Sequence, residues 1–392
     1  MKRRDFLTML AVGATSGCLQ LQEPSSTSTT DQSTAQSQPD STSATPLPQT
    51  TGAATDVTAT IREVQRLSLD MRLPVGISEL TAHADTYAIA LHEEIQLREF
   101  GTADPLVTLD IDTINPLIAL TGSDCYTSTP MDSSSATNPT TPVRRYDPET
   151  GTQRAKTTIK GAIRMLSRVG PWLVCGSVNE TDEFAQRYGN RITVLDAETL
   201  EQQWTTVFGN NSFPEAVCGI DGTLYVGFNN FLAAFDGADG TLRYRAPVTI
   251  SYPRPYKGDL IADADGKLRR ITPSIMEYDW SAGAGVAGRS VVHDTSVTVP
   301  TSDGVLSADV DSGAVNWSRT FESDSAFEPE QLRYHDGVLW YVDALGTLYL
   351  LDPQTGGTAA SGSYDSGHMA ATPKGVIVTD DDEVVELDRQ TP

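Results

Sequence analysis

The residues that could carry chemistry in this sequence are few and widely scattered. The four cysteines include no CxxC pair, and no histidine stands beside them at the spacing of a zinc site: Cys18, Cys125, Cys175 and Cys218. The five histidines include no pair four residues apart: His83, His92, His293, His335 and His368. No nucleophile elbow and no phosphate-binding loop occurs. The sequence therefore predicts no catalytic residue, no metal site and no bound cofactor.

Two acidic stretches resemble calcium ligands only superficially. Asp263-Ala-Asp-Gly266 lacks the glutamate that closes a calcium loop at its twelfth position, so it is interpreted as a hairpin turn. Asp380-Asp-Asp-Glu383 is interpreted as a solvated turn. Cys175 and Cys218 fall in neighbouring repeat units, and the sequence leaves open whether a disulfide joins them.

The overall charge excludes one class of partner. The chain has 28 Lys+Arg against 52 Asp+Glu, a formal net charge of −24, and only 6 of the basic residues are lysine. With no basic patch to neutralise phosphates, nucleic acid is not an expected partner. The arginine-rich, lysine-poor acidic composition resembles that of proteins from salt-loving archaea, whose carboxylates hold water and cations in brine.

The first 57 residues are predicted to be an export signal and a tether. Residues 1–17 have a basic start and an apolar run too short to span a bilayer as a helix. Arg3 and Arg4, followed by Phe6-Leu7, resemble a twin-arginine signal, although Lys2 stands where Ser or Thr is usual.

A lipid anchor is predicted at Cys18. Thr15-Ser-Gly-Cys18 resembles a lipobox, with Thr15 in place of the usual leucine. Residues 18–57 are rich in Ser, Thr, Gln and Pro and cannot bury enough apolar surface to fold, so they are expected to form a disordered linker. The predicted location is the extracellular face of the cell membrane.

An internal repeat covers the remaining residues, 58–392. A turn of the form Asp-x-x-(Thr/Ser/Asp)-Gly begins at Asp147, Asp236, Asp309 and Asp352. Weaker copies begin at Asp196 and Asp388, and degenerate ones at Gly101 and Thr272. An aliphatic residue stands four positions before each of the eight copies: Leu97, Val143, Ile192, Leu232, Leu268, Val305, Leu348 and Val384. An aromatic residue stands eight positions after four of them: Trp204, Tyr244, Trp280 and Trp317.

Each unit has the pattern of short strands joined by tight turns. The turn aspartate caps backbone N–H groups and the glycine adopts a positive φ. Units of this length predict an all-β fold, an eight-bladed β-propeller, with seven blades as the alternative if the Gly101 unit is not a true copy. The last unit ends before its outer strand, and residues 59–69 are expected to supply that strand and close the ring.

The strand, turn and tryptophan pattern resembles the PQQ-like repeats of quinoprotein dehydrogenases and of the β-propeller lipoprotein of bacterial outer-membrane assembly. The resemblance covers about residues 58–391. It implies that Trp204, Tyr244, Trp280 and Trp317 are structural residues that dock neighbouring blades.

The resemblance leaves two functions open. Quinoprotein dehydrogenases carry a vicinal cysteine pair, an aspartate base, a calcium site and a longer chain, and no Cys-Cys pair occurs here. The sequence therefore favours a membrane-anchored protein-binding or scaffolding module with an unidentified partner at the cell surface. The alternative is an extracellular quinone-dependent dehydrogenase or another ligand-binding enzyme, which needs a convergent cluster of acids, amides and a cation at the channel mouth.

Two further features could decorate the propeller. Thr121–Pro142 is an oversized insertion in the second blade, suited equally to recognition or to flexible decoration. Glycosylation sequons begin at Asn179, Asn210 and Asn316, the last beside a predicted packing tryptophan.

Overall fold

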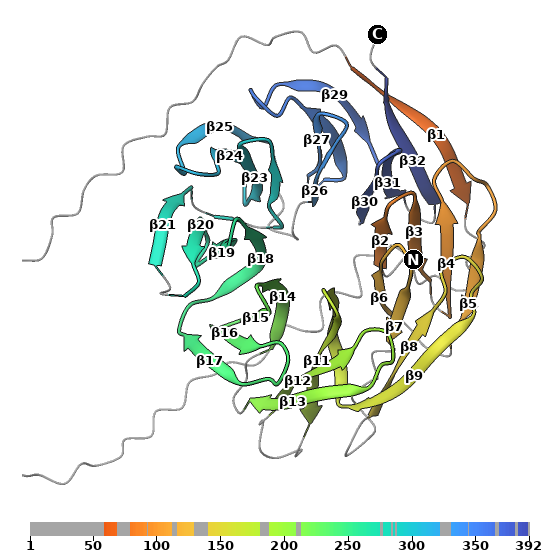
Figure 1. The fold of residues 1–392 in the computed structure, drawn as a ribbon. Helices are drawn as coiled ribbons and strands as arrows, with labels where there is room; N and C mark the ends of the chain where they lie inside the picture. Colours follow the sequence, from red (N-terminus) through yellow and green to blue (C-terminus); the bar gives the residue numbers. More distant parts are fainter. Residues whose placement is uncertain are drawn as a thin grey trace, which may run out of the picture. The chain divides into compact units, whose positions relative to one another are not determined.

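The described part of the chain is a ring of β-sheets in a computed structural model (Figure 1). The structure describes residues 59–68, 79–91, 93–111, 116–128, 140–180, 188–208, 213–274, 277–283, 285–286, 288–321, 331–343, 345–364, 368–380 and 383–390. All of them lie in one compact unit, Pro48–Pro392. In these ranges no helix is long and apolar enough to cross a membrane.

The first four blades follow the chain in order. Blade 1 contains β2 (Glu79–His83), β3 (Thr86–Ala90), β4 (Glu94–Glu99) and β5 (Val107–Asp110). Blade 2 contains β6 (Leu117–Leu120), β7 (Cys125–Ser128), β8 (Thr140–Tyr146) and β9 (Gln153–Lys160). Blade 3 contains β10 (Ala162–Val169), β11 (Trp172–Glu180), β12 (Tyr188–Asp196) and β13 (Gln202–Phe208). Blade 4 contains β14 (Pro214–Ile220), β15 (Thr223–Phe228), β16 (Phe231–Asp236) and β17 (Leu242–Ala246).

The next three blades repeat this order, and the last one departs from it. Blade 5 contains β18 (Ile250–Tyr256), β19 (Asp259–Ala264), β20 (Lys267–Thr272) and β21 (Glu277–Ala282). Blade 6 contains β22 (Val291–His293), β23 (Ser296–Thr301), β24 (Gly304–Asp309) and β25 (Val315–Thr320). Blade 7 contains β26 (Gln331–His335), β27 (Val338–Val342), β28 (Thr347–Leu351) and β29 (Thr358–Ser363). Blade 8 contains β30 (Met369–Thr372), β31 (Gly375–Asp380), β32 (Glu383–Gln390) and β1 (Thr60–Ser68).

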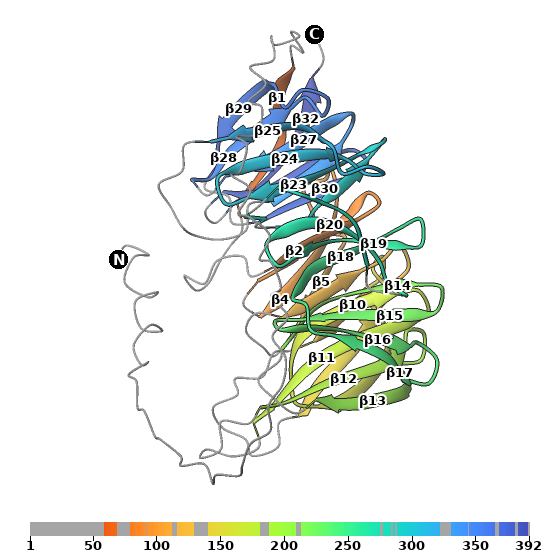
Figure 2. The ribbon, with the colours of Figure 1, turned by 90° about the vertical axis from the view of Figure 1, so that its left-hand side faces the viewer.

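Each blade is an antiparallel four-stranded sheet whose strands hydrogen-bond in chain order from the axis outwards, apart from β1 in blade 8. The first strands face the centre of the ring, as β2, β6, β14 and β18 do in Figure 1. Seen from the side, the blades lie next to one another along the ring (Figure 2). The predicted eight-bladed propeller is confirmed, and the seven-bladed alternative is wrong because the Gly101 unit forms blade 1.

The ring is closed by the two ends of the propeller sequence. Strand β1 pairs antiparallel with β32, from Thr60 opposite Gln390 to Ser68 opposite Glu383. The two strands have the opposite ends of the colour scale in Figure 1 but lie side by side. Arg66 on β1 reinforces the pairing through hydrogen bonds of 2.6 and 2.7 Å to Asp380 and Glu383. The predicted closure by an N-terminal strand is therefore confirmed, and the blade gains the outer strand that it would otherwise lack.

The hydrophobic core consists of layers between blades rather than one central core. The buried apolar residues of the described chain form eight clusters, and each cluster joins two neighbouring blades. The layer between blades 3 and 4, for example, packs Val174 and Ile192 against Phe228 and Phe231. A single blade would leave both of its faces exposed, so each blade depends on its neighbours for stability.

The repeated turn is stabilised by its aspartate. The Asp147 carboxylate accepts backbone hydrogen bonds of 2.9 Å from Glu149 and Thr150, while Gly151 adopts φ +68°. Donation from the Thr150 N–H lowers the pKa of Asp147. In the weaker copy that begins at Asp196, Leu200 occupies the glycine position with φ +59° and is buried. The glycine is therefore favoured by this turn but is not required for it.

Three tryptophans join their blade to the turn of the next one. The indole N–H groups of Trp204, Trp280 and Trp317 donate to the carbonyls of Gly237, Val310 and Pro353, at 2.9, 3.1 and 2.9 Å. Each acceptor is the residue after the turn aspartate of the following blade, and all three rings are buried. One polar bond and one buried ring are thus added at each of these three blade interfaces.

The turn glycine completes this contact because a side chain there would strike the tryptophan ring. A Cβ atom added at Gly240, Gly313 or Gly356 would lie 2.5 Å from an atom of the indole. Tyr244 occupies the same repeat position as the tryptophans, but it is half-buried beside Tyr225 of its own blade, with 6.4 Å between ring centroids. The following turn, at Thr272, has neither the aspartate nor the glycine that receives a tryptophan.

The closing interface between blades 8 and 1 has a polar contact instead of a tryptophan. Glu386 on β32 is fully buried and accepts hydrogen bonds from the Tyr87 hydroxyl, at 2.7 Å, and from the Gly101 backbone N–H, at 2.5 Å. Burial raises the pKa of Glu386 and of Tyr87. The described cysteines contribute no covalent link, since Cys125, Cys175 and Cys218 are free buried thiols and no disulfide joins Cys175 to Cys218.

We expect Gly240→Ala to lower the free energy of unfolding by about 1–3 kcal/mol more than Gly222→Ala does, because the added methyl strikes the Trp204 ring. The two glycines share φ +74°, but a Cβ atom added at Gly222 would have no atom within 4 Å, so this variant controls for backbone strain alone. Urea denaturation of both variants gives the difference. Equal losses would show that the indole does not restrict this glycine.

Candidate functional site

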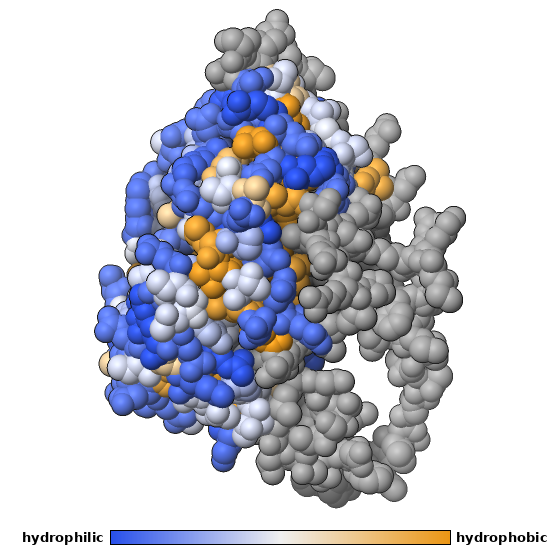
Figure 3. Space-filling model, turned by 90° about the vertical axis from the view of Figure 1, so that its right-hand side faces the viewer, coloured by the Kyte–Doolittle hydropathy of each residue, from blue (hydrophilic) through white to orange (hydrophobic). Residues whose placement is uncertain are grey.

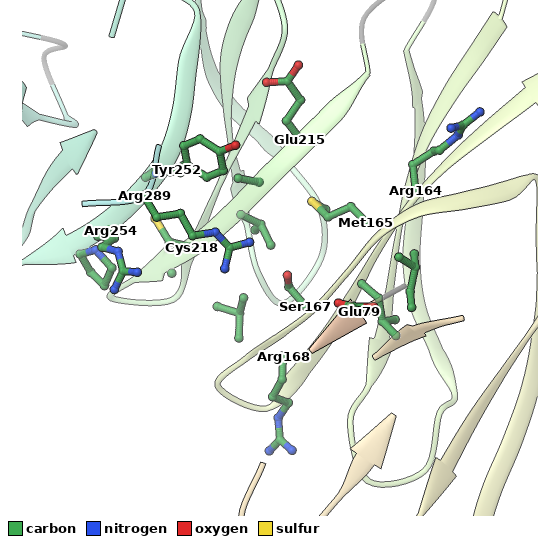
Figure 4. Close-up of a pocket in the computed structure, with 18 residues that line it drawn as sticks. Glu79, Arg164, Met165, Ser167, Arg168, Glu215, Cys218, Tyr252, Arg254 and Arg289 are labelled. Atoms are coloured by element: carbon green, nitrogen blue, oxygen red, sulfur yellow. The ribbon is translucent and has the colours of Figure 1, made fainter. Parts of the chain in front are cut away.

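The ring encloses a cavity on its axis that is lined by the first strands of several blades. Its main part has a volume of about 820 Å³. An adjoining part of about 510 Å³ shares Glu79, Arg168, Arg254 and Arg289 with it (Figure 4). These volumes fall in the range of small-molecule sites. The cavity is therefore the candidate functional site of the described chain.

Arginines from three consecutive blades dominate one side of this cavity. Arg254 on β18 and Arg333 on β26 occupy equivalent positions, each two residues before the last residue of the inner strand. Arg289 lies between them in the chain, two residues before β22. Figure 4 shows Arg254 and Arg289 close together, across the pocket from Arg164 and Met165. Blades 5, 6 and 7 thus each direct one guanidinium to the same cavity.

An irregularity in β18 helps to position two of the lining side chains. The pairing of β18 with β19 shifts register between Ser251 and Arg254, and Tyr252 adopts φ +52°. A bulky residue with a positive φ is an uncommon and strained conformation, and such bulges redirect side chains. The Arg289 guanidinium lies 5.6 Å from the centroid of the Tyr252 ring, a cation–π distance that holds it against β18.

The arginine cluster lacks neutralising partners. Among the described residues, no carboxylate oxygen lies within 4.0 Å of the guanidinium nitrogens of Arg254, Arg289 or Arg333. Arg333 donates 2.8 Å hydrogen bonds to two backbone carbonyls, those of Leu332 and Met369. Burial, together with the charges of Arg289 and Arg254, lowers the pKa of Arg333 to about 10, and burial lowers that of Arg254 as well. The cavity therefore holds concentrated positive charge in a chain of net charge −24.

Two glutamates also line the cavity, the half-buried Glu79 and the exposed Glu215. Glu79 on β2 accepts a 2.8 Å hydrogen bond from the Ile118 backbone N–H. Burial raises its pKa from the usual 4.5 to about 7, although the Ile118 hydrogen bond and the charge of Arg289 oppose this. Burial also raises the pKa of Glu215 on β14. Neither glutamate lies within salt-bridge distance of the arginine cluster in the described chain.

A fourth arginine of the cavity wall belongs to a structural network instead. Arg168 donates to the Tyr126 hydroxyl at 2.7 Å and lies 3.9 Å from buried Asp124. Asp124 also accepts from Arg145 and Arg154, at 2.5 and 3.0 Å, and these arginines lower its pKa against the effect of burial. The charge of Arg168 is therefore largely compensated, unlike that of Arg254 and Arg289.

The residues singled out in the sequence lie elsewhere. Arg3, Arg4 and Cys18 lie outside the described residues. Trp204, Tyr244, Trp280 and Trp317 are on the outermost strands of their blades, away from the axis. Asp263 lies near the end of β19 and Asp265 in the β19–β20 turn, and burial raises the pKa of Asp263 to about 6. Within the described ranges, no group of three or more His, Cys, Asp or Glu side chains could hold a metal ion.

Sequence reasoning missed the arginine cluster. The one signal in the sequence is an arginine, Arg254 or Arg333, in the first strand of two repeat units. The other six units have a small or apolar residue at the equivalent position. This difference becomes visible only when the inner strands are aligned by their register. The strand register gives Thr81, Ile118, Ser167, Cys218, Val291 and Ala370 at the positions equivalent to Arg254 and Arg333.

Comparison with known proteins identifies the repeat. A family model described as "Outer membrane protein assembly factor BamB" matches residues 135–361, more than half of the chain. The chain belongs to this PQQ-like repeat family. A solved structure of BamB from Moraxella catarrhalis is similar with a TM-score of 0.62 and 13% identity, over 84% of this chain and 99% of that one.

Dehydrogenases of the wider fold are also similar. A polyvinylalcohol dehydrogenase from Sphingopyxis sp. (strain 113P3) is 26% identical over 177 residues, 39% of this chain. The match spans only 26% of the length of that relative. A quinohemoprotein alcohol dehydrogenase from Pseudomonas putida HK5 is similar with a TM-score of 0.56 and 10% identity, over 84% of this chain and 76% of that one. At such identities the structural likeness shows the fold alone.

We expect the unfolding free energy of the wild type, relative to Glu79→Gln, to fall as pH rises from about 4.5 to about 7 and then to level off. The folded chain binds the Glu79 proton more tightly than the unfolded chain does, so deprotonation in this window favours unfolding. The full effect is up to about 3 kcal/mol. Denaturation curves across this pH range measure it, and a pH-independent difference would contradict the raised pKa of Glu79.

Proposed function

We propose that this chain is an exported, lipid-anchored propeller that binds or scaffolds a partner protein at the cell surface. Its membership of the BamB family is the observation that carries the proposal. That family is named for an assembly factor, and the propeller found here is a closed, rigid ring suited to presenting turns to a partner. The anchor is proposed at Cys18 and the export signal at Arg3 and Arg4.

The outer edge of the ring offers little for an apolar partner. Figure 3 shows the side of the ring near β1, β5 and β9, where hydrophilic surface surrounds a smaller hydrophobic area. The exposed large apolar side chains of the described residues are distributed over six blades: Val64, Leu106, Val207, Leu242, Tyr278 and Leu345. Scattered residues of this kind are normal on a soluble surface. The flat faces of the propeller are therefore the better candidates for docking.

The two faces can be assigned from the antiparallel topology. The turns from first to second strand and from third to fourth strand share one face, here called face A. The turns from second to third strand lie on the opposite face, here called face B. Face A carries aspartates in many of its turns, including Asp221, Asp294 and Asp336, so a partner that binds there needs a basic surface.

A quinone-dependent dehydrogenase is the second candidate, favoured by the partial match to the polyvinylalcohol dehydrogenase. The resemblance to quinoproteins implies a vicinal cysteine pair and a calcium site. The described cysteines are separate free thiols, and the described His, Cys, Asp and Glu residues do not converge on a metal position. The described cavity residues therefore do not fit this cofactor arrangement.

We expect Cys18→Ser to move the protein from the membrane fraction to the soluble exported fraction, because a thioether-linked lipid needs the cysteine sulfur. Cell fractionation and radiolabelled-lipid incorporation measure the change. Cys125→Ser is the matched control, since Cys125 is a buried free thiol of blade 2 and its loss leaves the anchor intact. Retention of Cys18→Ser on the membrane without label would contradict the proposed anchor.

Photo-crosslinking in intact cells tests the binding function. A crosslinking residue is placed at Asp221 on face A, at Leu345 on face B, and at Val207, which is 57% exposed on the outermost strand β13. We expect one discrete protein adduct from a single face and none from Val207, because a specific partner covers one patch. The absence of any adduct from both faces would contradict the scaffolding function.

A further inference from the structure

The cavity arginines gather positive charge that no described carboxylate neutralises. Arg254, Arg289 and Arg333 carry like charges that disfavour one another. Burial is the larger cause of the lowered pKa of Arg333, and the charges of Arg289 and Arg254 add to it. Among the described residues none of the three has a carboxylate partner within 4.0 Å. Arg254 and Arg333 are half-buried, whereas Arg289 is exposed. Grouping partly desolvated cations without counter-charges is costly, so a bound anion would stabilise this arrangement.

The donors of the cluster are not used up by the protein. The described chain provides Arg333 with two carbonyl acceptors, whereas no hydrogen-bond acceptor is found for the guanidinium groups of Arg254 and Arg289. Within the described residues, the contact found for the Arg289 guanidinium is the Tyr252 ring, and no described acceptor lies at its N–H groups. A guanidinium presents five N–H donors in a planar fork that fits carboxylate and phosphate oxygens in pairs.

The cavity provides room for a small ligand. Its volume of about 820 Å³ suits a small molecule, and the inner strands of the ring line it. Three guanidinium groups from adjacent blades surround one side, so a ligand with at least two anionic groups could bind more than one arginine. A single small anion would leave part of the positive charge unpaired.

We propose that the axial cavity binds a small multivalent oxyanion, a polycarboxylate or a polyphosphate, through Arg254, Arg289 and Arg333. This site goes beyond the docking of a partner protein, which the proposed function assigns to the faces of the ring. The arginines select a ligand by its negative charge and by its paired oxygen acceptors. Their attraction has to overcome the repulsion between the anion and the acidic surface of the protein.

The other titratable groups of the cavity tune its affinity. Glu79 on β2 and Glu215 on β14 oppose anion binding when ionised, and Arg164 on β10 favours it, whereas the charge of Arg168 is largely compensated by Asp124. His83 at the end of β2 and His368 before β30 also line the cavity. Protonation of Glu79 removes a negative charge and makes the cavity more positive. Affinity should therefore rise as pH falls through about 7, where Glu79 gains its proton.

Isothermal titration calorimetry of the full chain tests the site, with citrate and pyrophosphate as the probes. We expect one saturable site for at least one of the two probes. Binding of citrate would indicate a polycarboxylate ligand, and binding of pyrophosphate would indicate a polyphosphate ligand. The double variant Arg254→Gln/Arg289→Gln should bind at least about tenfold more weakly, since two charge-assisted contacts are lost. Circular dichroism and urea denaturation establish that the variant is folded.

A matched control removes one arginine from the rim. Arg245 is exposed on the outermost strand β17, so Arg245→Gln should leave the affinity within about twofold. Three results would overturn the proposal: no saturable binding of either probe, equal weakening by the rim variant, or unchanged affinity in the folded double variant. Binding of an acidic peptide without either small anion would also overturn it and would make the cavity part of a protein-docking surface. Crosslinking of a partner protein to face A or face B is a separate measurement. Failure of the anion-binding test therefore leaves the proposed scaffolding function standing.

Discussion

The contact between one blade and the turn of the next is the interaction on which the rest of this structure depends. A blade of four strands has two apolar faces and cannot bury either alone, so the core of the described chain is divided into eight layers between neighbours. At three of these layers a buried tryptophan donates to a carbonyl of the next turn and packs on its glycine. The same short motif therefore shapes the turn within a blade and receives the preceding blade. Its recurrence along the chain follows from this double role.

Closure imposes a second constraint, because a ring is stable only when its last layer is made. In blade 8 the outer strand comes from the start of the propeller sequence, unlike in the other seven blades. Pairing of β1 with β32 provides the missing strand, and Glu386 replaces a tryptophan contact by binding Tyr87 and the backbone at Gly101. A buried carboxylate with two hydrogen-bond donors requires both of them, since loss of either donor would leave the desolvated carboxylate without a partner that it needs. The first and last segments of the propeller are thereby made to depend on each other.

The cavity contains a group of positively charged side chains, opposite in sign to the net charge of the chain. A chain with a net charge of −24 places three arginines without carboxylate partners in the described cavity and raises the pKa of the glutamates that share it. Positive charge is thus gathered on the inner strands, whereas acidic residues occupy many of the turns. Such separation favours selection of an anion inside the ring and solubility outside it. Membership of the BamB family accounts for the fold, whereas the arginine cluster is a property of this chain's own inner strands.

The sequence by itself determined the all-β propeller, its eight units and its closure by residues 59–69, because turn motifs and aliphatic positions recur at a local spacing that strands must obey. It also located Trp204, Trp280 and Trp317. It gave Tyr244 the same role, although the degenerate turn at Thr272 lacks the aspartate and the glycine that receive a tryptophan. Only the tertiary structure decided that Arg254, Arg289 and Arg333 meet, since they are separated by 35 and 44 residues. Their proximity arises from the ring, which brings inner strands of successive blades to one axis. No local pattern encodes that convergence, because it depends on strand register, on a bulge at Tyr252 and on the angle between blades.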